Sequence, residues 1–357
     1  MNIGQQKDTQ QEIATVPSGS QEPSRLVRPE GRLTTFTAPL RQHRELASAI
    51  IFFVVMMIVF TIASPTVWLN SQSYSAVFVS LPIYIILAVA LVFIVVCGEI
   101  DLSFGSIVGV SALVFSEFAL AGWNPYVCVL LAILAGGIAG VLNGVLVSYI
   151  GLSSLVVTLG MNFLWRGLIQ IVTNGSGAPL TFLQNTTFHD VFVGQIGIFP
   201  TQMFWALGFA LVGVLLFARH KYGAYVRFVG DNPESAGEMG INVRAIRVAS
   251  FIYVGLAAGF AGVLTILINN NFYPTVGDGY LLSALAAVFV GGTPVIGGVG
   301  TVAGGVVGAF TVGFIESGIV AAGLTGYWTQ FVYGVVIVLS LLSHRIYSPK
   351  HKKSGAG

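Results

Sequence analysis

Residues 76–97 read Ala76-Val-Phe-Val-Ser-Leu-Pro-Ile-Tyr-Ile-Ile-Leu-Ala-Val-Ala-Leu-Val-Phe-Ile-Val-Val-Cys97, and none of them is charged. A helix that crosses the hydrocarbon core of a bilayer needs about 20 mostly apolar residues. This stretch therefore predicts a membrane-spanning helix, and it indicates that the chain as a whole is a membrane protein.

The composition of all 357 residues agrees with this prediction, because 55% are hydrophobic, 8% are charged and the mean hydropathy is +0.85. A soluble domain carries about 25% charged residues, so this chain has too few charges to cover a soluble surface. With only two cysteines, Cys97 and Cys128, a fold built on disulfides is excluded. The sequence predicts an all-α polytopic membrane protein.

The same length criterion predicts about ten transmembrane helices in all. They are expected near residues 46–63, 76–97, 103–121, 126–148, 152–172, 201–218, 248–268, 280–296, 300–320 and 327–343. Carboxylates interrupt the apolar pattern near 98–109, and Pro294 with several glycines interrupts it in 280–320. Broken helices are therefore expected in these two regions.

The positive charges predict the topology. Fifteen of the 16 Lys and Arg residues lie in three segments, namely 1–45, 219–247 and the chain after 343. Lys and Arg are enriched in cytoplasmic loops, so all three segments should face the cytoplasm, which six spans followed by four would satisfy. We therefore predict a disordered cytoplasmic N-terminal tail (1–45), a transmembrane domain (46–343) and a basic cytoplasmic C-terminal tail (344–357).

The segment Gly98-Glu-Ile-Asp-Leu-Ser-Phe-Gly-Ser106 places two carboxylates, Glu99 and Asp101, at membrane depth. Such groups are costly there unless they face water, a partner or a pore. The glycines and serines favour a broken helix in which Ser103 and Ser106 satisfy free backbone groups. Asp101 either caps the next half-helix or takes part in a translocation pathway.

Arg166 is the one basic residue outside the three cytoplasmic segments. It could extend to the membrane interface, with Trp165 as an anchor beside it. Alternatively it pairs inside the protein with a carboxylate such as Asp101 or Glu117. The sequence leaves both interpretations open.

Glycines recur at four-residue spacing, which predicts close helix packing in lipid. These glycines are Gly136, Gly140 and Gly144, then Gly255 and Gly259, and finally Gly300, Gly304 and Gly308.

The loop Asp231-Asn-Pro-Glu-Ser-Ala-Gly-Glu-Met-Gly-Ile-Asn-Val-Arg244 predicts a short helix over 233–240. Asn232 suits the N-cap, Pro233 suits the first turn, and Gly240 with Asn242 can end the helix in a left-handed turn. A short exposed helix between two spans is suited either to docking on a partner or to lying on the membrane surface.

Several motifs, in order along residues 76 to 343, resemble those of one family. Gly98–Ser106 is similar to the G-G-I-D-L-S-V-G-S signature of ribose-type sugar permeases, except that Glu99 replaces a glycine. Thr158–Leu168 resembles their T-L-G-x-x-x-x-x-R-G-L segment, and Glu234–Gly240 has the E-x-A-x-x-x-G spacing of a coupling motif. The glycine-rich blocks 274–280 and 291–300 resemble the family's late blocks, although Pro294 departs from the pattern. The chain is identified as a sugar-type member of the branched-chain amino acid and sugar ABC permease family.

The resemblance implies a permease subunit of a bacterial ABC importer in the inner membrane, with no catalytic residue, metal site or nucleic-acid partner. Its partners would be ATPase subunits, a second permease chain as homodimer or heterodimer, a periplasmic or lipoprotein sugar-binding protein, and membrane lipid. ATP and Mg²⁺ would be bound by the ATPase, since no G-x-x-x-x-G-K-[ST] phosphate loop occurs here. Coupling to the ATPase is expected at Glu234, Ala236, Gly240, Ile241 and Asn242. The pathway is expected at Glu99, Asp101, Ser103, Asn143, Asn162 and Arg166.

Three alternatives remain open. A branched-chain amino acid permease would need more fixed charge in the pathway to hold the two charges of its substrate. An ion-coupled secondary transporter would leave the 234–240 motif unexplained. A membrane-embedded enzyme would need clustered His, Asp or Ser residues at membrane depth, whereas all five histidines lie in predicted tails or loops without metal-ligand spacing.

Overall fold

The computed structural model describes residues 34–347, and residues 1–33 and 348–357 lie outside the described residues. The described residues from Pro39 onward belong to one compact unit. The described residues form fourteen α-helices. These are α1 (Thr34–Ala63), α2 (Pro65–Trp68), α3 (Ser71–Val96), α4 (Phe104–Leu120), α5 (Pro125–Ser148), α6 (Ser154–Thr173), α7 (Thr187–Val193), α8 (Thr201–Ala218), α9 (Lys221–Asp231), α10 (Pro233–Glu238), α11 (Val243–Asn269), α12 (Tyr280–Val290), α13 (Val302–Ala321) and α14 (Tyr327–Tyr347).

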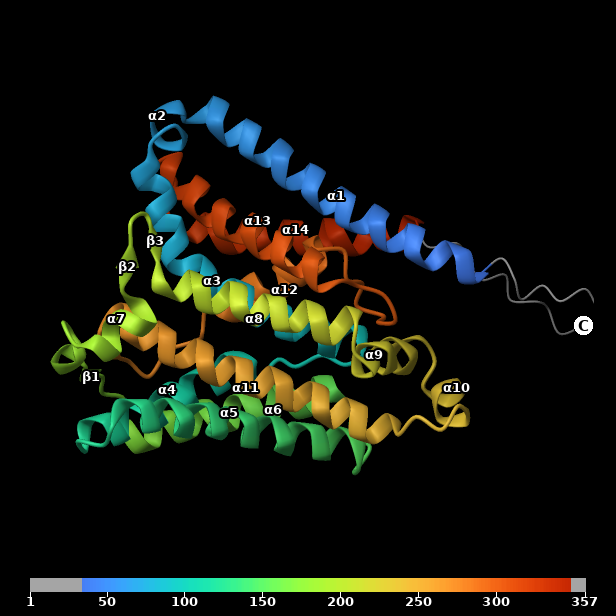
Figure 1. Ribbon diagram of the computed structural model, residues 1–357, viewed down its shortest axis with the longest axis horizontal. Coiled ribbons are helices and arrows are strands. Elements are labelled where there is room, and N and C mark those ends of the chain that lie inside the picture. The colour runs from blue at the N-terminus through green and yellow to red at the C-terminus, as the bar shows by residue number, and fades with distance from the viewer. Residues whose placement is uncertain (1–33, 348–357) are drawn as a thin grey trace, which may run out of the picture. The chain divides into compact units, whose positions relative to one another are not determined.

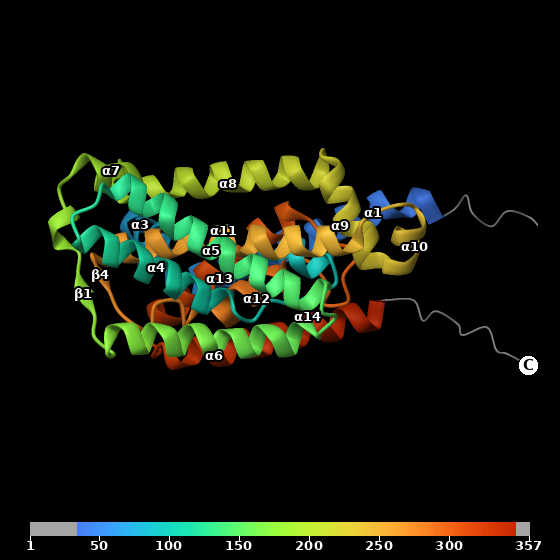
Figure 2. The ribbon, with the colours of Figure 1, turned by 90° about the horizontal axis from the view of Figure 1, so that it is seen from below.

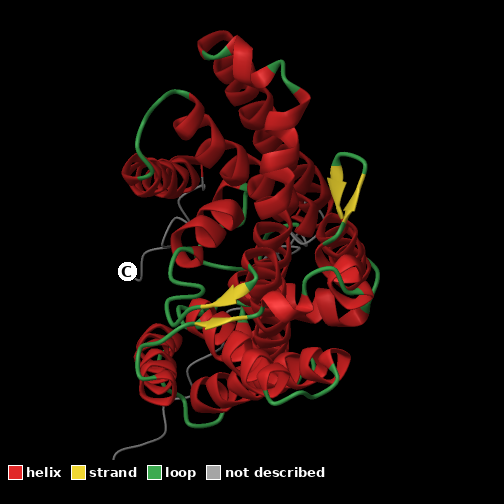
Figure 3. Ribbon diagram, turned by 90° about the vertical axis from the view of Figure 1, so that its left-hand side faces the viewer, coloured by secondary structure: helices red, strands yellow, loops and turns green. Residues whose placement is uncertain are grey.

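Four two-residue strands form two antiparallel pairs (Figure 3). Strand β1 (Ala178–Pro179) pairs with β4 (Asn271–Phe272), and β2 (Gln195–Ile196) pairs with β3 (Phe199–Pro200). The first pair ties the chain after α6 to the chain after α11, which are far apart in the sequence.

Seven helices of the described chain are long and apolar enough to cross a membrane, and each matches a predicted span. They are α1, α3, α5, α6, α8, α11 and α13, where α1 counts from Leu46. The other three predicted spans correspond to the shorter apolar helices α4, α12 and α14. The prediction of a helical membrane protein is therefore confirmed.

The boundaries between the two predicted tails and the transmembrane domain differ from those in the structure. Helix α1 begins at Thr34 and so extends into the predicted tail 1–45, while α14 continues to Tyr347. The remainder of each tail, 1–33 and 348–357, lies outside the described residues.

Helix α3, which contains the opening stretch, forms the centre of the fold. Every residue from Leu81 to Cys97 is buried, and α3 contacts α8, α11, α12 and α13. Its apolar surface therefore meets other helices over this length rather than lipid.

Helices α5 and α11 run side by side and contact each other through the predicted glycines (Figure 1). A Cβ atom placed on Gly136 would collide with the carbonyl oxygen of Gly255, and one on Gly140 would collide with that of Phe251. The backbones approach closely because no side chain separates them, as the spacing predicted. Gly300, in contrast, precedes α13, where it adopts a φ of +152°.

Gly136→Ala is expected to destabilise the protein by about 1–3 kcal/mol, since the new methyl group has no space between α5 and α11. Gly160→Ala is the matched control, because Gly160 is also helical but no heavy atom lies within 4 Å of the place that a methyl group would occupy. There the better helix propensity of alanine should raise stability by up to about 1 kcal/mol. Thermal unfolding in detergent measures both, and equal midpoints for the two variants would contradict the packing account.

The predicted breaks occur, with a correction to the extent of one helix. Residues 97–103 between α3 and α4 are not helical. Helix α12 ends at Val290, whereas the apolar pattern predicted a helix to residue 296. It ends there because Gly292 adopts a φ of +89° and the amide of Thr293 donates to the carbonyl of Val288 at 3.2 Å.

The two ends of the helix array differ in content. Figure 2 shows α10 at one end, with α7, β1 and β4 at the other. Helix α11 connects the two, because it begins beside α10 and ends beside β4. At the α10 end the amide of Gly298 donates to the carbonyl of Val96 at 2.8 Å, so the loop after α12 closes on the end of α3.

Candidate functional site

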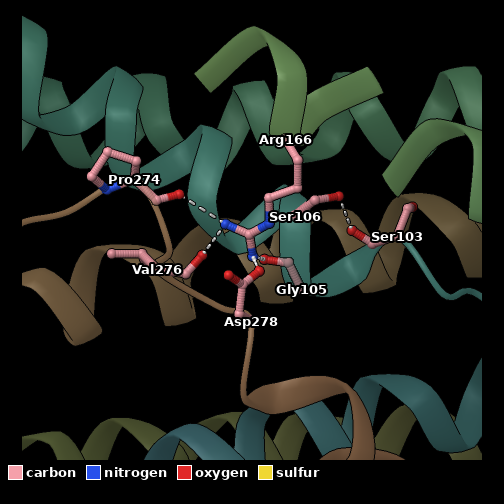
Figure 4. Close-up of polar contacts among 7 residues, drawn as sticks. All are labelled: Ser103, Gly105, Ser106, Arg166, Pro274, Val276 and Asp278. Carbon is pink, nitrogen blue, oxygen red and sulfur yellow. Dashed lines mark hydrogen bonds and ion pairs between the residues drawn. The ribbon is translucent and has the colours of Figure 1, made fainter. Parts of the chain in front are cut away.

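The guanidinium of Arg166 joins the first turn of α4 to the non-helical segment 274–278 inside the protein (Figure 4). Its Nη1 donates to the carbonyls of Pro274 and Val276 at 3.0 and 2.7 Å. Its Nη2 donates to the carbonyl of Gly105 at 3.3 Å and pairs with Asp278 Oδ1 at 2.6 Å. Arginine suits this position because its planar group offers five donors in a fixed geometry. The side chain thereby satisfies two backbone carbonyls of the non-helical segment before α12 and also contacts that of Gly105 in α4.

Of the two interpretations of Arg166, the internal pair is confirmed, but its partner is neither Asp101 nor Glu117. The partner is Asp278, which is 112 positions away in the chain and lies in the loop before α12. The Arg166 side chain is only 16% exposed, so it does not extend to an interface. Asp278 was missed because its segment follows the predicted span 248–268 and gives no sign of folding back toward α6.

Asp101 belongs to a second buried polar cluster at the start of α4. Its Oδ1 accepts from both the amide and the hydroxyl of Ser103 at 2.7 Å. Asn143 on α5 donates to the Ser103 hydroxyl at 2.7 Å and to Asp101 Oδ2 at 3.4 Å. All three side chains are fully buried. Their contacts are those of a tight turn that leads into α4 and is braced by a neighbouring helix.

Other side chains satisfy the rest of the broken segment. Thr158 Oγ1 accepts from the amide of Leu102 at 3.0 Å, and the Ser106 hydroxyl donates to the carbonyl of Ser103 at 2.7 Å. The latter bond agrees with the predicted role of the serines. Asn162 lies half-buried on α6, one turn before Arg166.

Glu99 forms an ion pair with Arg247, whose Nε lies 3.0 Å from Glu99 Oε1. Arg247 is one of the five positive residues in the predicted cytoplasmic segment 219–247. The pair therefore links the end of α3 to the first turns of α11, next to α10.

An open cavity of about 580 Å³ lies at the opposite end from α10. It is bounded by α3, the last turns of α11, the loop before α12, α13 and the start of α14. Polar and aromatic side chains dominate its walls: Ser80, Tyr84, Thr265, Asn269, Tyr273, Thr275, Asp278, Tyr280, Ser283, Glu316, Thr329, Gln330 and Tyr333. In the described part of the chain, these walls contain none of the six residues predicted for the pathway.

Hydrogen bonds and ring contacts order this wall. The Tyr84 hydroxyl donates to Glu316 Oε2 at 2.6 Å, and the rings of Tyr84 and Tyr280 meet edge to face with centroids 5.9 Å apart. The hydroxyls of Tyr280 and Thr265 lie 3.1 Å apart. Glu316 was missed although it is the single carboxylate within the predicted span 300–320, which is the signal that could have identified it.

Helix α10 forms as predicted, although it is shorter than 233–240. The Asn232 side chain accepts from the amides of Glu234 and Ser235 at 3.0 and 3.1 Å. Gly240 ends the helix with a φ of +80°. Asn242 does not take part in that turn, since it caps α11 by accepting from the amide of Ala245 at 3.0 Å.

The surface of α10 is almost entirely exposed. Ala236 is fully buried, and Ile241, whose amide donates to the Ala236 carbonyl at 3.0 Å, is half-buried. Glu234 and Met239 are exposed. The helix is anchored to the protein through one small side chain and presents its remaining surface outward.

Four features together are typical of a membrane transport protein. They are the apolar spans, the two broken segments held by buried polar side chains, the open polar cavity at one end and the exposed short helix at the other. The family model for the branched-chain amino acid transport system permease component matches residues 73–341, and the chain belongs to this family. It is a multi-pass inner-membrane protein.

Curated relatives cover most of the chain. The ribose import permease protein of Escherichia coli strain K12 is 32% identical over 260 residues, which are 72% of this chain and 80% of that protein. The D-allose transport system permease protein of the same strain is 29% identical over 300 residues, covering 83% and 91%. The autoinducer 2 import system permease protein of Yersinia pseudotuberculosis strain YPIII is 31% identical over 275 residues, covering 76% of each. No solved structure matches the chain.

Proposed function

We propose that the chain is the permease subunit of an ABC importer that takes up a monosaccharide. The observation that carries the proposal is the 32% identity to a ribose import permease across 80% of that protein. The D-allose relative supports the same class of substrate.

In this proposal the chain crosses the membrane ten times, with α4, α12 and α14 as the three shorter spans. The two termini and α10 face the cytoplasm, because the basic segment 219–247 surrounds α10. The cavity then opens toward the outside, and the junction of Gly298 with Val96 lies on the cytoplasmic side.

The partners in the proposal are ATPase subunits, a second permease chain and an external sugar-binding protein. Helix α10 docks in a groove of the ATPase, since it is exposed on nearly all sides and anchored through Ala236. Glu234, Gly240, Ile241 and Asn242 shape this contact. ATP and Mg²⁺ are bound by the ATPase.

The outer cavity forms the outer part of the pathway. Its tyrosines and small polar groups suit a neutral sugar, which needs ring contacts and hydrogen bonds of modest strength. For Glu99, Asp101, Ser103, Asn143, Asn162 and Arg166 we propose a supporting role. Those with hydrogen bonds or ion pairs serve in turns and braces rather than in the cavity wall.

The cavity favours a sugar over a branched-chain amino acid. An amino acid would bring a carboxylate, which is normally bound by arginine or lysine. The described cavity wall contains no Lys, Arg or His, and its two ionisable carboxyl groups are Asp278 and Glu316. Asp278 is already paired with Arg166.

The test is uptake into proteoliposomes that contain this chain with its ATPase and its sugar-binding protein. We expect ATP-dependent accumulation of at least one sugar from a panel that includes D-ribose and D-allose, with L-leucine as the negative control. An ATPase variant that binds but does not hydrolyse ATP should abolish it. Accumulation of leucine, or uptake that an ion gradient drives without ATP, would contradict the proposal.

A further inference from the structure

The outer cavity has an uneven distribution of charge. Its described wall carries two carboxyl groups and no basic side chain. The charge of Asp278 is compensated by Arg166, whose guanidinium lies behind the wall. Glu316 has no such partner among the described ion pairs, so it supplies the net charge of the cavity.

Glu316 is held in a defined position on the wall. One carboxylate oxygen, Oε2, accepts a short hydrogen bond from the Tyr84 hydroxyl at 2.6 Å. Tyr84 is 8% exposed and packs edge to face on Tyr280. Its ring is therefore fixed, and it fixes the carboxylate in turn.

The position of Glu316 leaves it accessible. It is half-buried on α13, and it lines both the outer cavity and an adjoining one of about 360 Å³. A carboxylate oxygen can accept more than one hydrogen bond, so the group keeps acceptor capacity after the bond to Tyr84.

We propose that Glu316, held by Tyr84 in the wall of the outer cavity, is a specificity-determining residue that accepts hydroxyl hydrogen bonds from a neutral polyol and excludes anionic sugars. The inference rests on the proposed function, since it assigns the chemistry of that same cavity. Aromatic faces beside it contact the C–H surface of the sugar, and its negative potential repels a phosphate or carboxylate on a sugar derivative.

The sign of the potential can be measured without transport. The background is full-length protein in which Cys97→Ala and Cys128→Ala remove the two buried free thiols. In this background, Ser80→Cys introduces a single thiol one turn before Tyr84 on α3. Ser80 is exposed and lines both cavities. Two methanethiosulfonate reagents are applied to membrane vesicles, one with a cationic trimethylammonium-ethyl group and one with an anionic sulfonatoethyl group. The rates at which they modify the thiol are then compared.

Ser71→Cys is the matched control, because Ser71 is exposed on the same helix and does not line the cavity. We expect the ratio of cationic to anionic rates to be about tenfold higher at residue 80 than at residue 71. Adding Glu316→Gln should remove most of that difference. Equal ratios at the two positions, or a ratio that Glu316→Gln leaves unchanged, would overturn the inference.

Uptake tests the acceptor role. Glu316→Gln should lower monosaccharide uptake by about tenfold, and Tyr84→Phe, which frees the carboxylate, should lower it less. Glu117→Gln serves as the control, because Glu117 is an exposed carboxylate on α4 outside the cavity. If the Gln variant fails to reach the membrane, the thiol rates at residues 80 and 71 in protein with wild-type Glu316 still test the sign of the potential, and equal ratios would overturn the inference.

The outcomes separate the two proposals. If the reconstituted transporter imports no monosaccharide, the proposed function fails whatever the thiols report. If it imports monosaccharide and Glu316→Gln does so at the same rate, the proposed function stands and the role of Glu316 is wrong.

Discussion

Arg166→Gln is expected to remove most of the folded protein from the membrane, with a loss of about 1–3 kcal/mol in stability for each buried carbonyl left without a donor. Glutamine can replace few of the donors that Arg166 gives to the carbonyls of Gly105, Pro274 and Val276. It also leaves Asp278 without its positive partner. The amount of monodisperse protein after detergent extraction, together with its unfolding midpoint, measures the effect.

Graded variants distinguish the contacts. Asp278→Asn keeps the hydrogen bonds from Arg166 to the carbonyls, so it should destabilise the protein less than Arg166→Gln does. Arg166→Lys offers a single ammonium in place of a planar guanidinium, so its loss of stability should lie between those of the other two variants. Arg219→Gln is the control, because Arg219 is an exposed arginine at the end of α8. If Arg166→Gln unfolds at the same temperature as this control, the guanidinium does not hold the two segments together.

Gly240→Val is expected to abolish coupling between ATP hydrolysis and uptake. Gly240 adopts a φ of +80°, which costs a residue with a Cβ about 1–2 kcal/mol, so valine should change the path of the chain after α10. Glu234→Lys should have the same functional result by reversing the charge on the exposed surface of the helix. Both variants should reach the membrane, yet sugar uptake and the stimulation of ATPase activity should fall at least tenfold.

Gly122→Val separates local strain from coupling. Gly122 also adopts a φ of +80° and has open space around it, but it follows α4. The strain should therefore be similar, while uptake per folded molecule should remain near the wild-type level. A Gly240→Val protein that transports as well as Gly122→Val would remove α10 from the coupling mechanism.

Features that depend on neighbouring residues could be predicted well from the sequence. Asn232 and Pro233 mark the start of α10 through cap chemistry that acts over three residues. The spacing of Gly136 and Gly140 reports a face of one helix, and that face was found in contact with α11. Apolar length likewise located the seven described helices that are long enough to cross a membrane, since it depends on the bilayer rather than on tertiary contacts.

Features that depend on which distant segments meet could not be predicted. Nothing in the segment around Arg166 indicates that residues 274–278 fold back against it, so Asp101 and Glu117 were equally reasonable partners. The cavity is a further example, because Tyr84, Thr265, Glu316 and Tyr333 come from four helices. A single polar residue on each apolar helix becomes informative only once the helices are placed side by side.

The lengths of the helices also constrain how the protein is made. Helix α3 is apolar enough to enter lipid unaided as it leaves the insertion machinery, yet it ends enclosed by protein. Helix α12 has 11 residues and so reaches only about 16 Å, roughly half of the hydrocarbon thickness. The non-helical segments on either side of α12 have backbone groups that are costly to leave in lipid without hydrogen-bond partners. We therefore expect α3 and Arg166 to be in place before the region around α12 takes up its final structure.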